Sequence, residues 1–197
     1  MTDWTSLTYV VVDVEGNGQQ PPDLVELTAV PIVAGVIGEP VNWLVKPELP
    51  IRNFAARIHG LTDKIVADAP AFDEIAAEVL KVLDADALIA HNAHVDVGVL
   101  QRKLGEWDCP EVFDTLKLAR RLLPGRETYR LGALVEAFKL DEGLAENLVP
   151  HRATYDALVT ARLFLRLANI PDDRPLTLEE LRGESPGGGD DEPATLF

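Results

Sequence analysis

A chain of 197 residues is long enough for one well-buried domain and too short for two ordinary ones. Its composition, 47% hydrophobic and 26% charged, is typical of a soluble globular protein, and its formal net charge of −15 argues against a protein that grips long duplex nucleic acid by the phosphates. No apolar run approaches the roughly 20 residues that a membrane-spanning helix needs, and the first residues lack the basic segment of a signal peptide, so we expect a cytoplasmic protein without a membrane partner.

The first predicted strand covers Tyr9 to Glu15, with the sequence YVVVDVE. Its four valines are typical of a strand that is buried on both faces. Asp13 and Glu15 are two residues apart, so strand geometry places both side chains on one face. Two ionised carboxylates at the end of a buried strand need a counter-charge, which a divalent cation would supply. The alternative is that the strand ends at Val12 and that both acids are solvated.

Two further strands are expected after a turn-like segment at residues 16–23. The glycines of this turn would let a substrate approach the backbone, but they suit a plain hairpin loop equally well. We expect strands at 24–32 and 36–47, with antiparallel pairing across the short loop. Pro31 and Pro40 predict breaks or edge positions.

Helical patterns alternate with short strands in the middle of the chain. A helix begins near Asp73, a short strand covers 87–90, and a second helix carries Asp96 in its first turns. The residues that this second helix is expected to bury are Val95, Val99, Leu100 and Leu104.

The C-terminal half predicts a minimal strand at 112–113 and helices at 115–123, 129–140 and 152–168. The last of these helices is expected to bury one stripe, formed by Leu158, Ala161, Leu165 and Ala168. Residues 171–197 are rich in Pro, Gly and acids and predict a flexible acidic tail.

Strands that come first and then alternate with helices predict an α/β fold with a mixed sheet and helices on its faces. In such sheets, sites gather where strand ends meet helix starts. Asp96, Asp156 and His151 all lie at such boundaries. Each is a weak signal alone, because a lone acid on a helix is usually solvated and a lone histidine is usually structural.

Three ordered motifs make the combination specific: DVE at 13–15, HNAHVD at 91–96 and HRATYD at 151–156. Together they resemble the motifs of the DEDDh class of 3′-5′ exonucleases, which includes DNA polymerase III epsilon-like proofreading exonucleases. The resemblance runs from about Tyr9 to Leu167. It implies an RNase H-like fold with a mixed five-stranded sheet in an exonuclease domain at 1–170, and a role in DNA replication or repair.

The resemblance also implies a reaction. The enzyme would hydrolyse phosphodiester bonds at the 3′ end of single-stranded DNA and release nucleoside 5′-monophosphates. Two classes of alternative stay open: an exonuclease of the same fold that acts on RNA, and a non-catalytic module that binds metal or a nucleic-acid end.

Two Mg²⁺ or Mn²⁺ ions are the cofactors that the resemblance implies, and such hard cations prefer carboxylate oxygen and water. Asp13 would bridge both ions, Glu15 and Asp156 would share one, and Asp96 would act mainly through water. His151 would be the general base on the attacking water. In the tyrosine subclass the base lies four residues before the last Asp, where this chain has Arg152, so the histidine subclass is implied.

Substrate contacts are expected at Gly16 and Asn17, where the family usually has Thr, and at Asn92. Residues 117–130 form the one clearly basic run, and we expect Arg126 and Arg130 to touch phosphates. The alternative is a solvated helix face. His91 and His94 could equally orient the start of the helix that carries Asp96.

The last residues, Thr195, Leu196 and Phe197, resemble the short peptides by which replication and repair proteins bind a sliding clamp, although the usual upstream Gln is absent. A polymerase or clamp is therefore a candidate partner. The alternatives are a chance ending and a tail that docks back on its own domain.

Overall fold

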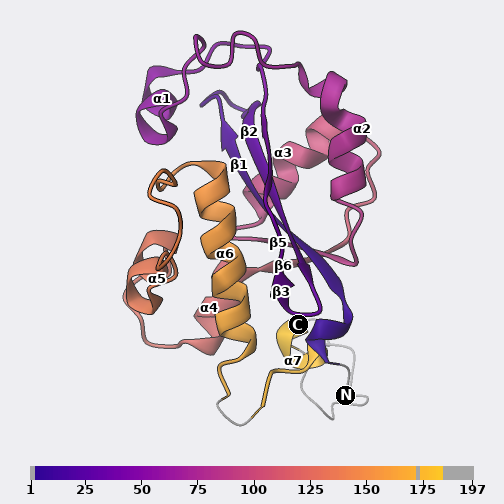
Figure 1. The fold of residues 1–197 in the computed structure, drawn as a ribbon, viewed down its shortest axis with the longest axis vertical. Helices are drawn as coiled ribbons and strands as arrows, with labels where there is room; N and C mark the ends of the chain where they lie inside the picture. The colour runs from indigo at the N-terminus through magenta and orange to yellow at the C-terminus, as the bar shows by residue number, and fades with distance from the viewer. Residues whose placement is uncertain (1–2, 172–173, 184–197) are drawn as a thin grey trace, which may run out of the picture.

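The computed structural model describes residues 3–171 and 174–183. They form one mixed sheet in the order β3-β2-β1-β5-β6, and β4 also pairs with β2 (Figure 1). β1 is antiparallel to β2 and parallel to β5. The strands are β1 (Thr8–Gly16), β2 (Leu24–Val33), β3 (Val36–Ile37), β4 (Val41–Leu44), β5 (Ala87–Ala90) and β6 (Glu111–Asp114).

Helices cover both faces of the sheet, which confirms the α/β fold class (Figure 1). One face packs against α2 and α3, and the other packs against α4, α5, α6 and α7. The helices are α1 (Asn53–His59), α2 (Phe72–Val82), α3 (His94–Leu104), α4 (Thr115–Leu122), α5 (Leu131–Phe138), α6 (Ala153–Ala168) and α7 (Leu178–Arg182), after a short 3₁₀ turn η1 (Trp4–Ser6). Across residues 3–171 and 174–183, no helix combines the length and the apolar character that crossing a membrane requires.

β1 alternates between two cores, as the period-2 pattern predicts. Tyr9 and Val11 are buried in the core beneath α6, whereas Val10 and Val12 are buried in the core beneath α2 and α3. Burial of each aliphatic side chain stabilises the fold by about 1.5–3 kcal/mol. The strand therefore continues past Val12, and Asp13 lies in the row that faces α6.

The third predicted strand is split, so the sheet has six strands where the resemblance implied five. β4 pairs with β2 at residues 26–29 and β3 pairs with β2 at residues 32–33. Pro31 lies between these two stretches, where its missing N–H breaks no ladder hydrogen bond. β2 itself continues through Pro31 to Val33, so the interruption at this proline is in the pairing with the outer strands and not in the strand.

Two predictions of buried helix faces are wrong in part, although Val99, Leu100, Ala161 and Ala168 are buried as predicted. Val95 is exposed, because α3 instead turns Asp96 inward, where the structure buries it. In α6, Leu158 and Leu165 are only half-buried and the fully buried residues include Leu163 and Phe164. The stripe is displaced because α6 packs against the sheet and against α4 and α5 at once, so no single face decides its burial.

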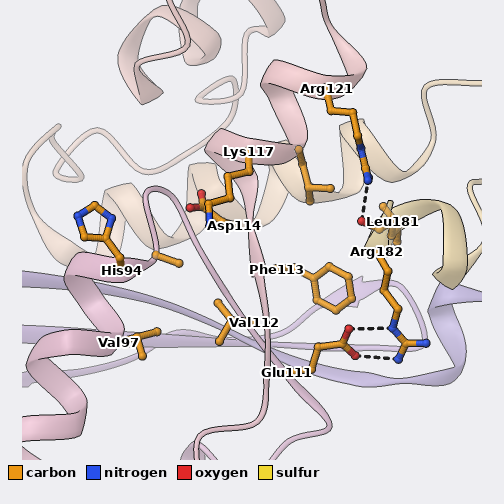
Figure 2. Close-up of a pocket in the computed structure, with 12 residues that line it drawn as sticks. His94, Val97, Glu111, Val112, Phe113, Asp114, Lys117, Arg121, Leu181 and Arg182 are labelled. Atoms are coloured by element: carbon orange, nitrogen blue, oxygen red, sulfur yellow. Dashed lines mark hydrogen bonds and ion pairs between the residues drawn. The ribbon is translucent and has the colours of Figure 1, made fainter. Parts of the chain in front are cut away.

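The expected flexible tail does not include residues 174–183. α7 begins with a capping box in which Thr177 and Glu180 bond each other's backbone N–H groups, and it buries Leu178 and Leu181 against the core. Figure 2 shows that Arg182 then pairs with Glu111 at the edge strand β6. The residues assigned to clamp binding, 195–197, lie outside the described part of the chain.

Candidate active site

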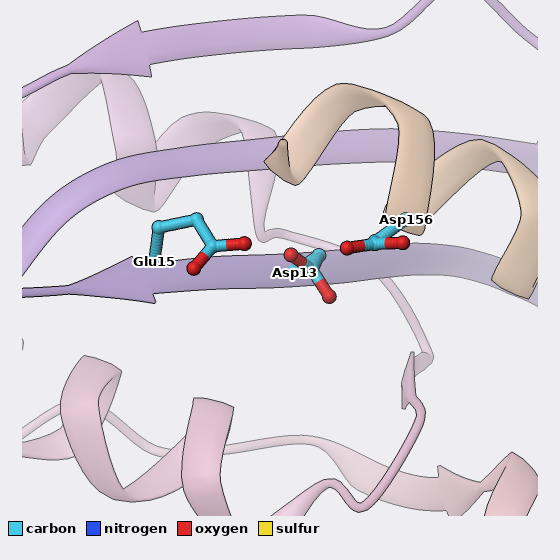
Figure 3. Close-up of side chains that lie close together, drawn as sticks. All are labelled: Asp13, Glu15 and Asp156. Carbon is cyan, nitrogen blue, oxygen red and sulfur yellow. The ribbon is translucent and has the colours of Figure 1, made fainter. Parts of the chain in front are cut away.

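Three carboxylates meet at the end of β1, and we call Asp13, Glu15 and Asp156 the carboxylate cluster (Figure 3). Each offers an oxygen that lies within 4.8 Å of the oxygens offered by the other two. Asp13 and Glu15 come from adjacent outward positions on one face of β1, and Asp156 comes from the first turn of α6. The donor set is three hard oxygen ligands without a cationic side chain among them, which fits Mg²⁺ or Mn²⁺.

The electrostatics of the carboxylate cluster show why a cation belongs there. Burial, together with Asp96 and Asp156, raises the pKa of Asp13 well above its usual range. Burial is also the main cause that raises the pKa of Glu15 to about 8 and the pKa of Asp156 to about 6. The metal-free site therefore disfavours its own ionised form, and a bound cation would reverse that preference.

These pKa values predict how stability depends on pH. Carboxyls in the unfolded chain have pKa values of about 4. In the folded chain the pKa of Asp156 is raised to about 6 and that of Glu15 to about 8. Between these limits the folded state binds more protons than the unfolded state, so the free energy of unfolding of the metal-free protein falls as pH rises. Thermal unfolding in EDTA should show this fall, and the gain in Tm on adding Mn²⁺ should be larger at about pH 8 than at about pH 5. Equal gains at both pH values would contradict the assignment of a cation to the cluster.

Asp96 lies beside the cluster but is not part of it. It is buried in the first turn of α3, and its Oδ1 accepts a hydrogen bond from the Val14 N–H at 3.1 Å. β1 pairs with β5 only as far as Val11, so Asp96 supplies an acceptor to the strand where the ladder has ended. Burial raises the pKa of Asp96 to about 7. Its expected action through water stays a prediction.

His151 lies at the start of α6 with an exposed side chain. Its backbone N–H donates to Asp156 Oδ2 at 3.0 Å, and its φ of 63° is left-handed, which is uncommon for a residue with a side chain. It lines a cavity of about 660 Å³ together with Asp13. The structure thus brings the predicted base to the carboxylate cluster, in a backbone conformation of the strained kind that gathers at functional sites.

Two residues of β2 near the cluster, Glu26 and Thr28, escaped the sequence analysis. Glu26 on β2 is buried and accepts hydrogen bonds from Arg152 Nε at 3.0 Å and Nη2 at 2.7 Å. Glu26 pairs with Glu15 across β1 and β2, so both lie on the face that looks toward α6. The available signal was the alternation in LVELTAV, which places Glu26 and Thr28 on one face of the predicted strand.

The structure gives no support to the substrate contact expected at Asn17, whose backbone N–H donates to the Asp23 carbonyl at 2.9 Å. Asn17 is fully buried, its Oδ1 accepts from Gln19 N–H and Asp23 N–H, and its Nδ2 donates to the Leu49 carbonyl. The amide therefore holds the loop together. Gly16 remains a candidate, because it ends β1 next to Glu15 and is partly exposed.

The side chains of the basic run at 117–130 lie in two different environments. Arg130 lines the cavity that contains Asp13 and His151, and so does Arg120, which the sequence analysis did not select. Arg126 instead stacks over Phe138, with its guanidinium carbon 4.8 Å from the ring centroid, and does not line this cavity. The structure gives no support to the phosphate contact expected at Arg126, since the turn after α4 directs its guanidinium onto Phe138.

Asn92 and His91 lie at the end of β5, on the same cavity. Asn92 has a left-handed φ of 68° and donates its N–H to Asp114 Oδ1 at 3.0 Å. His91 lies within hydrogen-bond distance of Thr115 Oγ1, at 2.9 Å, and of the Tyr129 carbonyl, at 3.1 Å, and burial lowers its pKa. His91 therefore contacts the start of α4 and the segment before α5, and not α3 as the structural alternative expected. Asn92 stays a candidate for substrate binding.

Comparison with known proteins gives consistent matches. The RNase T family model, described as Exonuclease, matches residues 10–164. The chain is 34% identical over 183 residues to the 3′-5′ exonuclease DinG of Bacillus subtilis, covering 88% of this chain but 19% of that protein. It is 36% identical over 159 residues to exodeoxyribonuclease 10 of Escherichia coli, covering 81% of this chain and 68% of the relative.

A solved structure, exonuclease X in complex with 5′ overhanging duplex DNA, shares the fold. It superposes with a TM-score of 0.72 at 32% identity, and the match covers 88% of this chain and 98% of that chain. The described fold is therefore similar over nearly the whole length of that solved chain.

Proposed function

This chain belongs to the exonuclease family whose model matches residues 10–164, and we propose that it removes nucleotides from the 3′ end of single-stranded DNA, releasing nucleoside 5′-monophosphates. The observation that carries the proposal is the convergence of Asp13, Glu15 and Asp156 on one point, in a cavity that His151 shares with Asp13. That combination supplies ligands for cations and a base for water, which are the two needs of phosphodiester hydrolysis.

Asp13, Glu15 and Asp156 would hold the two divalent cations, and Asp96 would act through water. When bound, Mg²⁺ or Mn²⁺ supplies charge stabilisation for the attacking and leaving oxygens. His151 accepts the proton of the attacking water, whose oxygen forms the new bond to phosphorus. The phosphorus–oxygen bond to the 3′ oxygen of the shortened strand breaks, and the released nucleotide keeps its 5′ phosphate. Histidine suits this role because its ordinary pKa is about 6.5, so it can accept a proton at neutral pH.

DNA is the proposed substrate because relatives above 30% identity are named as an exodeoxyribonuclease or were solved with DNA. RNA offers the same scissile phosphate and differs at the 2′-OH. Digestion of matched DNA and RNA oligomers in Mn²⁺ tests the choice, and faster release from DNA is expected. Equal or faster release from RNA would favour the RNA-directed alternative, and retention of both oligomers without cleavage would favour a binding module.

Two cavities meet at His151, and the charges that line them favour one of the two as the path of the DNA strand. The cavity of about 660 Å³ has Arg120 and Arg130 on its rim, with Glu127 as the one acid outside the catalytic set. A neighbouring cavity of about 1170 Å³ also reaches His151 and Arg130. Its remaining charged lining is mostly acidic: Glu127, Glu136, Lys139, Asp141, Glu142 and, from the carboxylate cluster, Asp156. Phosphates would therefore lie along the smaller, basic cavity.

Replacing both Arg120 and Arg130 with Ala is expected to raise KM and to flatten its salt dependence. Each phosphate contact to a single strand contributes about 0.7 to the log–log slope, so the slope should fall by about 1.4. KM measured against salt concentration provides the test. The matched control is Arg126→Ala with Arg166→Ala, which removes the same charge from two residues that stack over Phe138. Equal effects in the two double variants would contradict a local phosphate grip.

The C-terminal Leu196 and Phe197 carry the proposal of a partner. Relatives of this chain include a DNA polymerase III subunit epsilon-like protein, which is 36% identical over 185 residues. If residues 195–197 bind a sliding clamp, the benefit is tethering to DNA without a new catalytic contact. Deleting residues 186–197 should leave activity on a free oligonucleotide unchanged and lower it on clamp-loaded DNA. Equal activity of the two forms on clamp-loaded DNA would argue against clamp binding.

A further inference from the structure

The start of α6 is attached to the sheet through one buried carboxylate. Glu26 is 1% exposed, yet four donors converge on it. Its Oε2 accepts from Arg152 Nε and from the Ala153 N–H, both at 3.0 Å, and its Oε1 accepts from Arg152 Nη2 at 2.7 Å and Asn42 Nδ2 at 3.1 Å. The Arg152 guanidinium holds the pKa of Glu26 below its usual range, against the opposing effect of burial.

A second contact, between Thr28 and Thr154, extends the attachment of α6 to the sheet by one residue beyond Ala153. Thr28 Oγ1 lies 3.1 Å from Thr154 Oγ1 and accepts from Asn42 Nδ2 at 2.8 Å. Glu26 and Thr28 occupy alternate positions of β2, opposite Glu15 and Asp13 on β1. Glu26 and Thr28 therefore fix residues 152–154 against one face of the sheet. The same face carries Asp13 and Glu15.

His151 immediately precedes these fixed residues. No hydrogen bond to its imidazole is found within residues 3–171 and 174–183, so the place of the ring depends on its backbone. That backbone is left-handed, a strained conformation that persists only where the surroundings enforce it. Asp156 holds the His151 N–H from one side, and Glu26 holds Arg152 and Ala153 on the other.

We propose that Glu26 is a positioning residue, which acts on catalysis through Arg152 by holding His151 in its left-handed conformation beside Asp156. The proposal rests on the proposed function, in which His151 is the general base. An Arg fork matched to a carboxylate fixes direction as well as distance, which a single charge contact does not. Glu26 thereby carries out its role without touching substrate or metal.

The test is a double-mutant cycle between Glu26→Gln and His151→Ala. Gln keeps the size of the side chain and an acceptor for the Ala153 N–H, but it removes the charge that grips Arg152. Glu26→Gln alone should lower kcat about 10- to 100-fold, as the loss of an orienting partner typically does. KM and Mn²⁺ affinity should remain near those of the unaltered protein. In the His151→Ala background the same change should cost nothing further, because the residue that it positions is gone.

Glu111→Gln is the matched control. Glu111 also holds an arginine through two hydrogen bonds, both at 2.8 Å from Arg182, but it does so beside α7 on a groove that contains no member of the carboxylate cluster (Figure 2). This variant should keep full kcat. If Glu26→Gln fails to fold, Arg152→Lys replaces it, since Lys keeps the charge and loses the fork, and a fall in kcat is again expected.

Three results would overturn the proposal while leaving the exonuclease assignment intact. These are an unchanged kcat in Glu26→Gln, a full further loss in the His151→Ala background, and a loss of Mn²⁺ affinity in step with kcat, which would assign the effect to Asp156. Inactivity of the unaltered protein on every oligonucleotide would instead overturn the proposed function itself, and this inference with it.

Discussion

Asp13→Ala is expected to reduce nucleotide release to the background rate. Asp13 lies between Glu15 and Asp156, and its oxygen lies within 4.8 Å of both of theirs, so its removal takes away the ligand that two cations would share. Loss of a general base costs about 10²–10⁴-fold, and loss of the shared ligand should cost more, since both the attacking and the leaving oxygen lose their cation. Release of mononucleotides from a labelled single strand in Mn²⁺ measures the effect.

The same variant should fold at least as well as the unaltered protein. Burial and neighbouring carboxylates raise the pKa of Asp13, so when no metal is bound the folded state disfavours the ionised carboxylate relative to the unfolded state, and removing the carboxyl relieves that cost. Tm in EDTA should be equal or higher, whereas the gain in Tm on adding Mn²⁺ should disappear. Asp73→Ala, in the exposed first turn of α2, is the control and should keep both activity and the Mn²⁺ response. Near-normal release by Asp13→Ala would refute the metal assignment.

His151→Ala is expected to lower the rate about 10²–10⁴-fold, which is the typical contribution of a general base. Mn²⁺ affinity should change little, because the cluster of three carboxylates does not include His151. A single-turnover rate and a Mn²⁺ titration on the same variant measure the two quantities separately.

The alternative role for His151 is that of a metal ligand, in which case Mn²⁺ affinity would fall in step with the rate. His94→Ala is the control, since His94 is also exposed but lines a groove without a member of the carboxylate cluster. A full rate in His151→Ala would show that another group takes the proton.

Two members of the carboxylate cluster could be predicted from strand geometry because they lie close together in the sequence. Asp13 and Glu15 follow an apolar strand at a spacing of two, and strand geometry alone puts them on one face. Asp156 and His151 are far away in the chain, and only the resemblance of three ordered motifs joined them to β1. The boundaries of most predicted elements differ from the observed ones by two residues or fewer, because buried aliphatic runs and helical periodicity are strong signals.

The remaining features depend on tertiary contacts that no spacing reveals. Glu26 looks like an interruption in an apolar strand until Arg152, 126 positions later, is placed opposite it. Asn17 lies in a segment with the composition of an exposed turn, but its side-chain amide is buried and bonds the backbone of that loop. Arg120 and Arg126 belong to one basic run, and the end of α4 sends them to different surroundings. Such assignments need the register of the sheet and the path of the turns.

The most direct test of the central claim uses single-stranded DNA labelled at its 5′ end and digested by the full chain in Mn²⁺. The account predicts a ladder that shortens from the unlabelled 3′ end, with nucleoside 5′-monophosphates as the products, and no shortening in EDTA or with Asp13→Ala. Cleavage at internal bonds, loss of the label as a mononucleotide at early times, or shortening that persists in Asp13→Ala would contradict it.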